Sequence, residues 1–157
     1  MSAAKQGGVC RVRIADWTRD QDTLRAIRSQ VFIDEQKVPP ELEWDGEDAG
    51  CVQLLVEDAQ GRPVGTGRMF PHGKIGRMAV LREARGQGVG ALLMHRFISL
   101  AGERGLQELV LDAQTHAIPF YEKFGFVAGG EEFMDAGIPH RRMWRRAPAA
   151  TVAPPTR

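Results

Sequence analysis

The chain has 157 residues, of which 43% are apolar and 26% charged, an ordinary mixture for a single globular domain. Its 21 Lys and Arg nearly balance its 20 Asp and Glu, so no whole-chain field would gather nucleic acid or an anionic lipid surface. No apolar run approaches the ~18 residues of a membrane span, and the first residues lack the apolar stretch of a signal peptide. We therefore expect a cytoplasmic protein with no nucleic-acid or membrane partner, and with its two cysteines reduced.

The first third of the chain predicts a strand followed by a helix. Alternation of Val, Arg and Ile predicts a strand over residues 9–14. Leu24, Ile27 and Val31 recur at helical spacing and predict a helix over residues 18–33, in which Arg25 and Arg28 would face water. Two prolines end that region, and an acidic loop is expected to follow over residues 41–48.

Three strands follow in close succession. They are predicted over residues 51–57, 63–70 and 75–81, and short glycine-containing turns separate them. Strands joined by such short turns pair antiparallel with their neighbours, so these three should form a meander.

The second half predicts the longest helix and the remaining strands. One apolar stripe runs along residues 88–104, and Gly105 follows as a cap. A strand over 106–113, a short helix over 116–124 and a hairpin of 126–133 with 141–146 come next. The alternation of strands and helices predicts an α/β (α+β) fold with a mixed sheet. Residues 1–8 and 147–157 are expected to be a flexible N-terminus and a disordered tail around a domain of residues 9–146.

A glycine-rich loop between the third meander strand and the long helix is the strongest functional signal. Gly86, Gly88 and Gly90 stand at alternate positions where the helix begins. The first turn of a helix has free N–H groups and the positive end of its dipole, so it attracts phosphate. Glycine lets a pyrophosphate approach the main chain, and Arg82 and Arg85 would add charge-assisted contacts.

Glycine spacing alone leaves other phosphate sites open. A dinucleotide-binding enzyme would use G-x-G-x-x-G after the first strand of a βαβ unit. Here the spacing is G-x-G-x-G, the preceding strands form antiparallel hairpins, and no lysine of a nucleoside-triphosphate loop follows. These differences argue against a nicotinamide oxidoreductase.

Two motifs together resemble one enzyme family. The sequence Arg-Gly-Gln-Gly-Val-Gly at 85–90 resembles the R/Q-x-x-G-x-G/A signature of the GNAT N-acetyltransferases. Residues 117–126 resemble that superfamily's A-x-x-x-Y-x-x-x-G-F segment, and residues 31–36, 112–114 and 137–140 resemble its ElaA-like branch. The resemblance implies the GNAT fold, a mostly antiparallel sheet of six to seven strands that splays at its centre and is flanked by helices.

The resemblance also implies that the protein binds acetyl-CoA. In GNAT proteins the pantetheine arm lies in the gap of the sheet, where it would bind the main chain of Met78, Ala79 and Val80 like an added strand. Gln114 falls where many relatives carry an Asn that contacts pantetheine. The main-chain amides that would hold the pyrophosphate are those of Arg85, Gly86, Gln87, Gly88, Val89, Gly90 and Ala91.

Candidate catalytic residues follow from the same likeness. Tyr121 matches the usual general acid, a phenol that gives a proton to the departing thiolate. Glu35, at the end of the first helix, is the first candidate for the base that takes a proton from the acceptor amine or for its counter-charge. Rival bases are Glu43, Asp45, Glu131 and His140. The four histidines show no metal-ligand spacing, so no metal is expected.

The acceptor is expected to be a primary amine on a small molecule or peptide. Gln36, Trp44, Arg68 and Arg77 are candidates for its pocket. The acidic residues of 41–48 hint at a cationic acceptor, although a solvated loop would look the same. An acyl-CoA sensor without turnover is the alternative function, and a homodimer is expected only by analogy with GNAT relatives.

Overall fold

The computed structural model describes residues 9–147. The expected flexible N-terminus, residues 1–8, lies outside this range, as do residues 148–157 of the expected tail. Ala147, the first residue of that tail, lies within it, and its main-chain N–H donates to the carbonyl of Gln107 at 2.9 Å.

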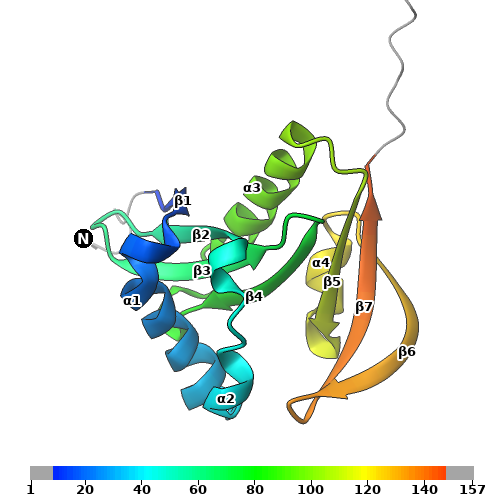
Figure 1. Ribbon diagram of the computed structural model, residues 1–157, viewed down its shortest axis with the longest axis horizontal. Helices are drawn as coiled ribbons and strands as arrows, with labels where there is room; N and C mark the ends of the chain where they lie inside the picture. The colour runs from blue at the N-terminus through cyan, green and yellow to red at the C-terminus, as the bar shows by residue number, and fades with distance from the viewer. Residues whose placement is uncertain (1–8, 148–157) are drawn as a thin grey trace, which may run out of the picture.

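Within the described residues the strands form one seven-stranded sheet (Figure 1). Its order is β1-β2-β3-β4-β5-β7-β6, and every neighbouring pair is antiparallel except β4 with β5. This arrangement confirms the predicted meander and the mixed, mostly antiparallel sheet. The strands are β1 (Arg11–Ala15), β2 (Val52–Glu57), β3 (Pro63–Met69), β4 (Lys74–Val80), β5 (Glu108–Gln114), β6 (Val127–Asp135) and β7 (Ile138–Arg146).

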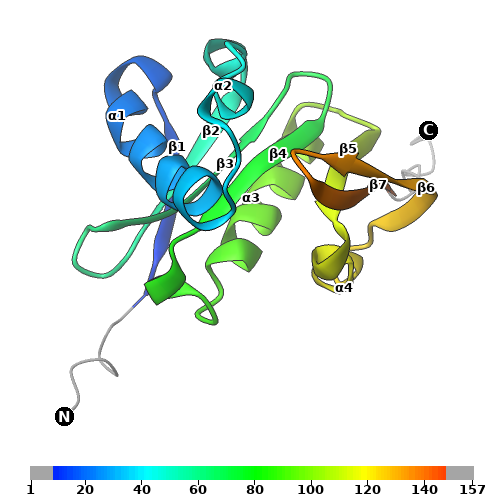
Figure 2. The same ribbon diagram turned by 90° about the horizontal axis from the view of Figure 1, so that it is seen from below.

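Helices cover both faces of the sheet. In β2, Leu54 and Val56 pack with α3 while Leu55 packs with α1, since successive side chains point to opposite faces. Figure 2 shows α1 and α2 on one side and α3 on the other. The helical segments are α1 (Trp17–Arg28), η2 (Ser29–Glu35), α2 (Pro40–Glu43), η3 (Asp48–Gly50), η4 (Arg82–Ala84), α3 (Val89–Glu103), η5 (Thr115–Ala117) and α4 (Ile118–Glu122).

The predicted first helix, residues 18–33, is observed as two segments. Asp16 caps α1 by accepting from the main-chain N–H of Thr18 at 2.9 Å. After Arg28 the chain continues as a π-helical segment, in which the N–H of Gln36 reaches the carbonyl of Val31 at 3.1 Å. Glu35 and Gln36 lie at the end of this wider turn.

The prediction that Arg28 faces water is wrong. Its side chain is fully buried, because Nε donates to Glu43 at 2.7 Å and Nη1 donates to Asp48 at 2.6 Å. Both carboxylates come from the segment expected to be an acidic loop, which instead forms α2 and η3 and is held against α1 by these pairs.

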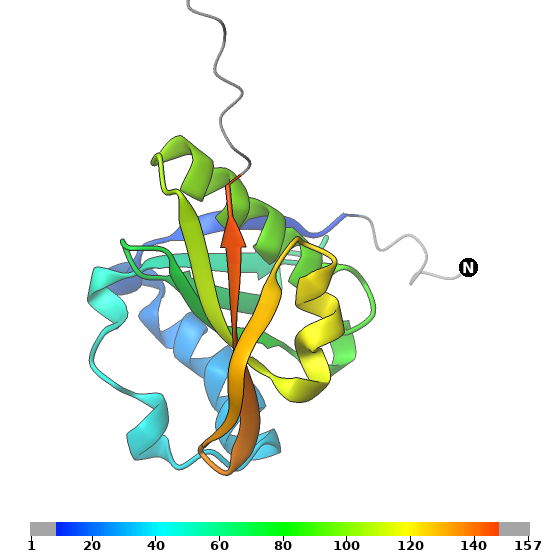
Figure 3. The ribbon, with the colours of Figure 1, turned by 90° about the vertical axis from the view of Figure 1, so that its right-hand side faces the viewer.

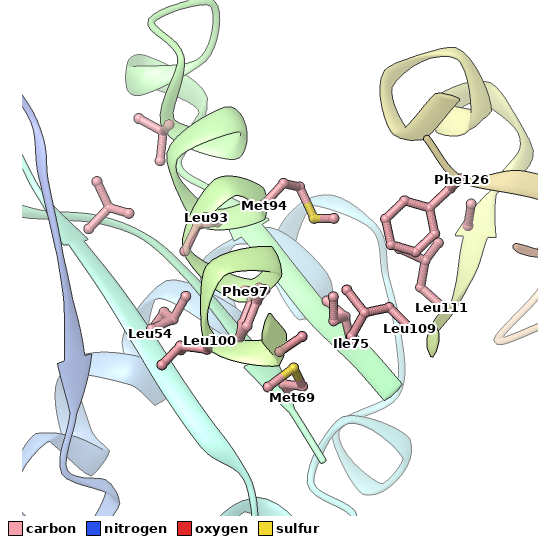
Figure 4. Packing of buried hydrophobic residues seen from close by; sticks show 14 of the residues in the cluster. Leu54, Met69, Ile75, Leu93, Met94, Phe97, Leu100, Leu109, Leu111 and Phe126 are labelled. Atoms are coloured by element: carbon pink, nitrogen blue, oxygen red, sulfur yellow. The ribbon is translucent and has the colours of Figure 1, made fainter. Parts of the chain in front are cut away.

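The main core lies between α3 and the sheet (Figure 4). The apolar stripe of α3 predicts this face, and Leu93, Met94 and Phe97 are completely buried on it. Beyond β4, Leu111 and Phe126 extend the same cluster under α4.

A bulge in β4 opens the sheet. Gly67 of β3 faces two residues of β4, because the register shifts between Thr66↔Ala79 and Arg68↔Gly76. Arg77 at the bulge has φ +50°, a left-handed conformation rare for a residue with a Cβ. Bulges bend and twist a strand, and β4 pairs with β5 only through Lys74 and Ile75.

The last hairpin is longer than predicted. We expected its second strand over 141–146, but β7 begins at Ile138. Ala136 and Gly137 both have positive φ, the conformation of a two-residue hairpin turn. Alanine is rarely found there, and Pro139 argues against a strand. Pro139 is tolerated because β7 pairs there with β6, and its pairing with β5 begins at the next residue.

Candidate active site

A cleft of about 710 Å³ lies where β4 and β5 diverge. Among the described residues, the edge of β4 toward β5 has no strand partner from Gly76 to Val80. Met78 and Val80 of this segment line the opening. Its walls come from η2, α2, η5, α4 and the turn of the β6–β7 hairpin. In Figure 3 this turn approaches η2 and α2. Of the sequence-predicted site residues, those that line the cleft are Glu35, Gln36, Glu43, Arg77, Met78, Val80, Arg82, Arg85, Gln114, Tyr121 and His140.

The glycine loop places free N–H groups at one end of β4. Gly86 and Gly88 have φ +80° and +83°, which glycine alone adopts easily, and an added Cβ would meet no atom within 4 Å at either. Gly88 is the N-cap of α3 and has no side-chain cap. No main-chain N–H from residue 86 to residue 91 has a partner among the described residues. These free donors lie at a helix start, which is where the sequence predicts a phosphate cradle.

Gly90 serves a different purpose from the other two glycines. Its φ is not in the left-handed region, but a Cβ there would lie 3.1 Å from the ring of Phe120. Glycine thus lets Phe120 of α4 pack against the first turn of α3.

Glu35 is held by the arginines of the loop. Arg85 binds its carboxylate through two hydrogen bonds of 2.7 and 3.0 Å, and Arg82 adds a third of 3.0 Å. The hydrogen bond from Arg85, supported by Arg82, holds the pKa of the Glu35 carboxyl below its ordinary value. Arg85 is further fixed by donating Nε to the carbonyl of Val80 at 3.0 Å. Glu35 is therefore an ionised partner of Arg82 and Arg85, which precede the glycines.

A chain of polar side chains crosses the cleft. Gln114 of β5 donates to the side-chain carbonyl of Gln36 at 2.9 Å, and its own carbonyl lies 2.7 Å from Nε2 of His116. This chain connects η2 to β5 and η5, so it bridges the two halves of the split sheet. His116 was not a predicted site residue, although it follows Gln114 by only two positions.

Tyr121 lies between the cleft and the aromatic packing of α4. Its ring contacts Phe120 and Phe126 edge to face, with centroids 5.0 and 6.3 Å away. No charged group compensates for this apolar setting, so burial raises the pKa of Tyr121 to about 12. The phenol is therefore fully protonated at neutral pH.

Two predicted acceptor residues lie outside the cleft. Arg68 is buried and pairs with Asp45 and Asp48, at 2.5 and 2.9 Å. Trp44 stacks on Arg25 and Arg28 at 5.1 and 5.0 Å. Neither residue lines the opening, so the structure gives no support for their contact with an acceptor.

Arg77 lies at the cleft, but other contacts already hold it. Its Nη2 donates to the carbonyls of Leu42 and Glu43, at 3.2 and 3.1 Å. Its Nε lies 3.2 Å from the Glu43 carboxylate, but at an angle too poor for a hydrogen bond. Arg77 thus joins β4 to α2 beside the buried ion pairs. A quarter of its side chain is exposed.

Buried ion pairs also occupy most of the acidic segment. Glu43 and Asp48 pair with Arg28, and Asp45 pairs with Arg68. Burial raises the pKa of the Glu43 carboxyl despite Arg77 and Arg28. The hydrogen bond from Arg68 instead holds the pKa of Asp45 well below its usual range. Only Glu41 and Glu47 of this segment remain free of ion pairs in the described chain, which weakens the hint of a cationic acceptor.

Three further observations concern membrane spans, metal ligands and the cysteines. Between residues 9 and 147, no helix is long and apolar enough to cross a membrane. In the same range, no group of three or more His, Cys, Asp or Glu side chains could hold a metal ion. Cys10 and Cys51 are free thiols.

Comparison with known proteins agrees with this geometry. Residues 18–146 match the family described as the acetyltransferase (GNAT) domain, so the chain belongs to the GNAT acetyltransferase family. It is 40% identical over 123 residues to the uncharacterized N-acetyltransferase YjcF of Bacillus subtilis, a match that covers 76% of this chain and 87% of that protein.

Solved structures show the same fold. An acyl-CoA N-acyltransferase from Pseudomonas aeruginosa superposes with a TM-score of 0.76 and 29% identity, over 87% of this chain and 99% of that one. Escherichia coli ElaA gives a TM-score of 0.75 and 25% identity, over 88% and 100%. The predicted GNAT fold and its likeness to ElaA are thus confirmed.

Proposed function

We propose that this protein is an N-acetyltransferase that moves the acetyl group of acetyl-CoA to a primary amine, by direct attack while both substrates are bound. One observation carries the proposal. The free N–H groups of residues 86–91 directly follow Arg85, which lines the cleft together with the unpaired β4 edge and Tyr121.

The described residues fit a CoA thioester. The open edge of β4 offers main-chain groups of Met78, Ala79 and Val80 to the pantetheine amides, as in β-strand addition. The N–H groups from Gly86 to Ala91, with the Arg85 guanidinium, would hold the pyrophosphate. Gln114, at the middle of the cleft, can exchange its bond to Gln36 for a pantetheine amide.

Tyr121 is the proposed general acid. When the amine attacks the thioester carbonyl, the carbon–sulfur bond breaks and its electron pair goes to sulfur. A protonated phenol beside the cleft supplies the proton that makes this sulfur a thiol. The raised pKa of Tyr121 keeps the donor form present throughout the physiological range.

For Glu35 we propose a positioning role. A carboxylate that accepts three hydrogen bonds from two arginines, with a lowered pKa, is a weak base. Its position instead orients Arg85 toward the loop that would bind phosphate. This contact supports cofactor binding more than proton removal from an amine.

The binding of Glu35 by two arginines also supports a second candidate function, an acyl-CoA sensor. With Glu35 engaged, a chain that binds acyl-CoA and lacks any other base would be a sensor without turnover. The two functions share the phosphate loop and differ only in chemistry, so a binding measurement alone does not separate them.

An acceptor screen that follows free CoA thiol tests the proposal. The purified chain is given acetyl-CoA and a panel of polyamines, aminoglycosides, amino acids and lysine peptides. We expect thiol release that depends on an added amine. Mass spectrometry should show that the amine has gained about 42 Da, the mass that one acetyl group adds. Tight binding by calorimetry without transfer to any amine would favour the sensor, and no binding would exclude both.

A further inference from the structure

We propose that His140 is the general base that removes a proton from the acceptor amine. The inference rests on the proposed acetyltransferase function and adds the residue that the family resemblance leaves open. His140 lines the cleft, and the only hydrogen bond from its ring to a described residue uses Nδ1.

The sheet places His140 across from the centre of the cleft. It lies on β7 directly opposite Gln114 of β5. Opposite residues of an antiparallel pair project from the same face. His140 therefore shares the face of Gln114, whose side chain reaches across the opening to Gln36.

The contacts of His140 fix which nitrogen can accept a proton. Nδ1 lies 2.7 Å from the main-chain carbonyl of Ile138. A carbonyl oxygen only accepts hydrogen bonds, so Nδ1 carries the hydrogen, and Nε2 of the neutral ring has a free lone pair. Phe133 stacks on the ring at 5.8 Å and 21°, and the residue is 9% exposed, so the ring is held in this orientation.

The rival bases are engaged elsewhere or lie outside the cleft. Glu35, Glu43 and Asp45 are bound by arginines. Glu131 is exposed on β6 and does not line the cleft. Asp112 lines it but pairs with Lys74 and Arg142.

Two further groups in the cleft are less suited to the role. His116 uses Nε2 as a donor to Gln114, which ties this ring to the bridge across the cleft. Asp135 is exposed at the hairpin turn, so its carboxylate is not enclosed as the ring of His140 is. His140 thus combines a free acceptor nitrogen with a fixed, largely buried ring.

The proton balance assigns His140 one step. Nε2 takes one proton from the ammonium group, which frees the lone pair that forms the carbon–nitrogen bond. The second proton leaves nitrogen as the carbon–sulfur bond breaks and replaces the proton that Tyr121 gives to sulfur. His140 then returns its proton to water, so one ammonium and one thioester yield one amide, one thiol and one proton.

The first test needs no acceptor. Nitrogen-15 NMR of the wild-type protein, with the His140 signals assigned by their loss in His140→Gln, reports the tautomer of the neutral ring. We expect hydrogen on Nδ1 and a bare Nε2. Hydrogen on Nε2 would overturn the inference whatever the activity of the protein.

The second test compares nucleophiles in the acetyl-CoA assay. His140→Gln should lower kcat/KM for the best ammonium acceptor of the panel by about 10²- to 10⁴-fold, with an unchanged Kd for acetyl-CoA. With hydroxylamine, which is uncharged at neutral pH, the loss should be at least about tenfold smaller, because no proton blocks attack. His72→Gln, in the exposed turn before β4, is the matched control and should keep wild-type rates.

The outcomes separate the two proposals. A wild-type protein that binds no acetyl-CoA, or transfers acetyl to no amine, would reject the proposed function and with it the base. An active wild type with an equally active His140→Gln would reject His140 alone. Equal losses with both nucleophiles would also reject it, because they would indicate damage to the cleft instead of a missing base.

Discussion

Tyr121 shows how a single side chain acquires its chemistry from its surroundings. The ring is surrounded by phenylalanines and by the cleft wall, and no charge lies close enough to stabilise a phenolate. The pKa of Tyr121 therefore rises to about 12. Because the protonated form is the donor, the proton is available below that pH and is lost only as the pH rises toward 12.

Tyr121→Phe should lower kcat about 10²-fold and leave acetyl-CoA binding unchanged, because phenylalanine keeps the packing and removes only the proton donor. Thiol release gives kcat, and calorimetry gives Kd. In the wild type, loss of the Tyr121 proton should not reduce kcat below about pH 10. A variant with wild-type kcat would remove Tyr121 from the mechanism.

Gly88→Glu should weaken acetyl-CoA binding at least about 100-fold, since a carboxylate would stand at the free N–H groups that attract phosphate. Two controls separate charge from backbone strain. Gly88→Asn tests the left-handed φ of +83°, which asparagine tolerates, and Gly102→Glu adds the same charge on α3 where a Cβ meets nothing within 4 Å. Calorimetric affinity like the wild type in Gly88→Glu would contradict the phosphate cradle.

At the scale of elements, buried ion pairs join α1 to α2, η3 and β3. Arg28 and Arg68 both form ion pairs with Asp48, and Arg77 forms an ion pair with Glu43. Burial works against an ionised Asp48, but hydrogen bonds and charge from Arg28 and Arg68 lower its pKa overall. These pairs hold α2 beside the cleft, and thereby hold the wall that Leu42 and Glu43 contribute.

Arg28→Ala should reduce the free energy of unfolding by about 3–5 kcal/mol, because it leaves two buried carboxylates without their main partner. Urea denaturation measures the change. The matched control is Arg25→Ala on the same helix, where the exposed side chain only stacks on Trp17 and Trp44 and the cost should be about 1 kcal/mol or less. If both variants lost equal stability, the buried network would not be what anchors α2.

At the scale of the whole molecule, the sheet has two parts joined weakly at its centre. β4 and β5 pair at only two register positions, and the bridge from Gln36 to Gln114 adds one side-chain contact across the opening. A ligand in this gap contacts both parts at once. Binding should therefore stabilise the folded protein as a unit. The expected homodimer stays a prediction.

Acetyl-CoA at about 100 times its Kd should add about 2.7 kcal/mol of stability. For a domain of this size the Tm should rise by about 5–10 °C. Thermal unfolding with acetyl-CoA, CoA and NAD tests this, and we expect the first two to raise Tm and NAD to leave it unchanged. A rise with NAD of equal size would favour the dinucleotide site that the loop spacing argues against.

Much of the fold could be predicted because its signals are local. The apolar stripe of α3, the alternation over residues 9–14, and the glycines before α3 each report on residues that are close in sequence. The long strand β7 was missed at its start, since Ala136 in a left-handed turn and Pro139 in a strand both go against local preference. Long-range pairing with β5 and β6 overrides that preference.

The sequence by itself determined the family, the sheet and the loop that would bind phosphate. These features follow from helix and strand periods and from glycine spacing, which depend only on residues close in sequence. Only the tertiary structure decided the state of each ionisable group. Glu35 binds Arg85, which is 50 positions away in the sequence, and Arg28 binds Asp48, which is 20 positions away. The pairing of β7 with β5 places His140 opposite Gln114, and the ring of Phe133 stacks on it there. Charge and burial depend on such distant contacts, and local patterns do not record them.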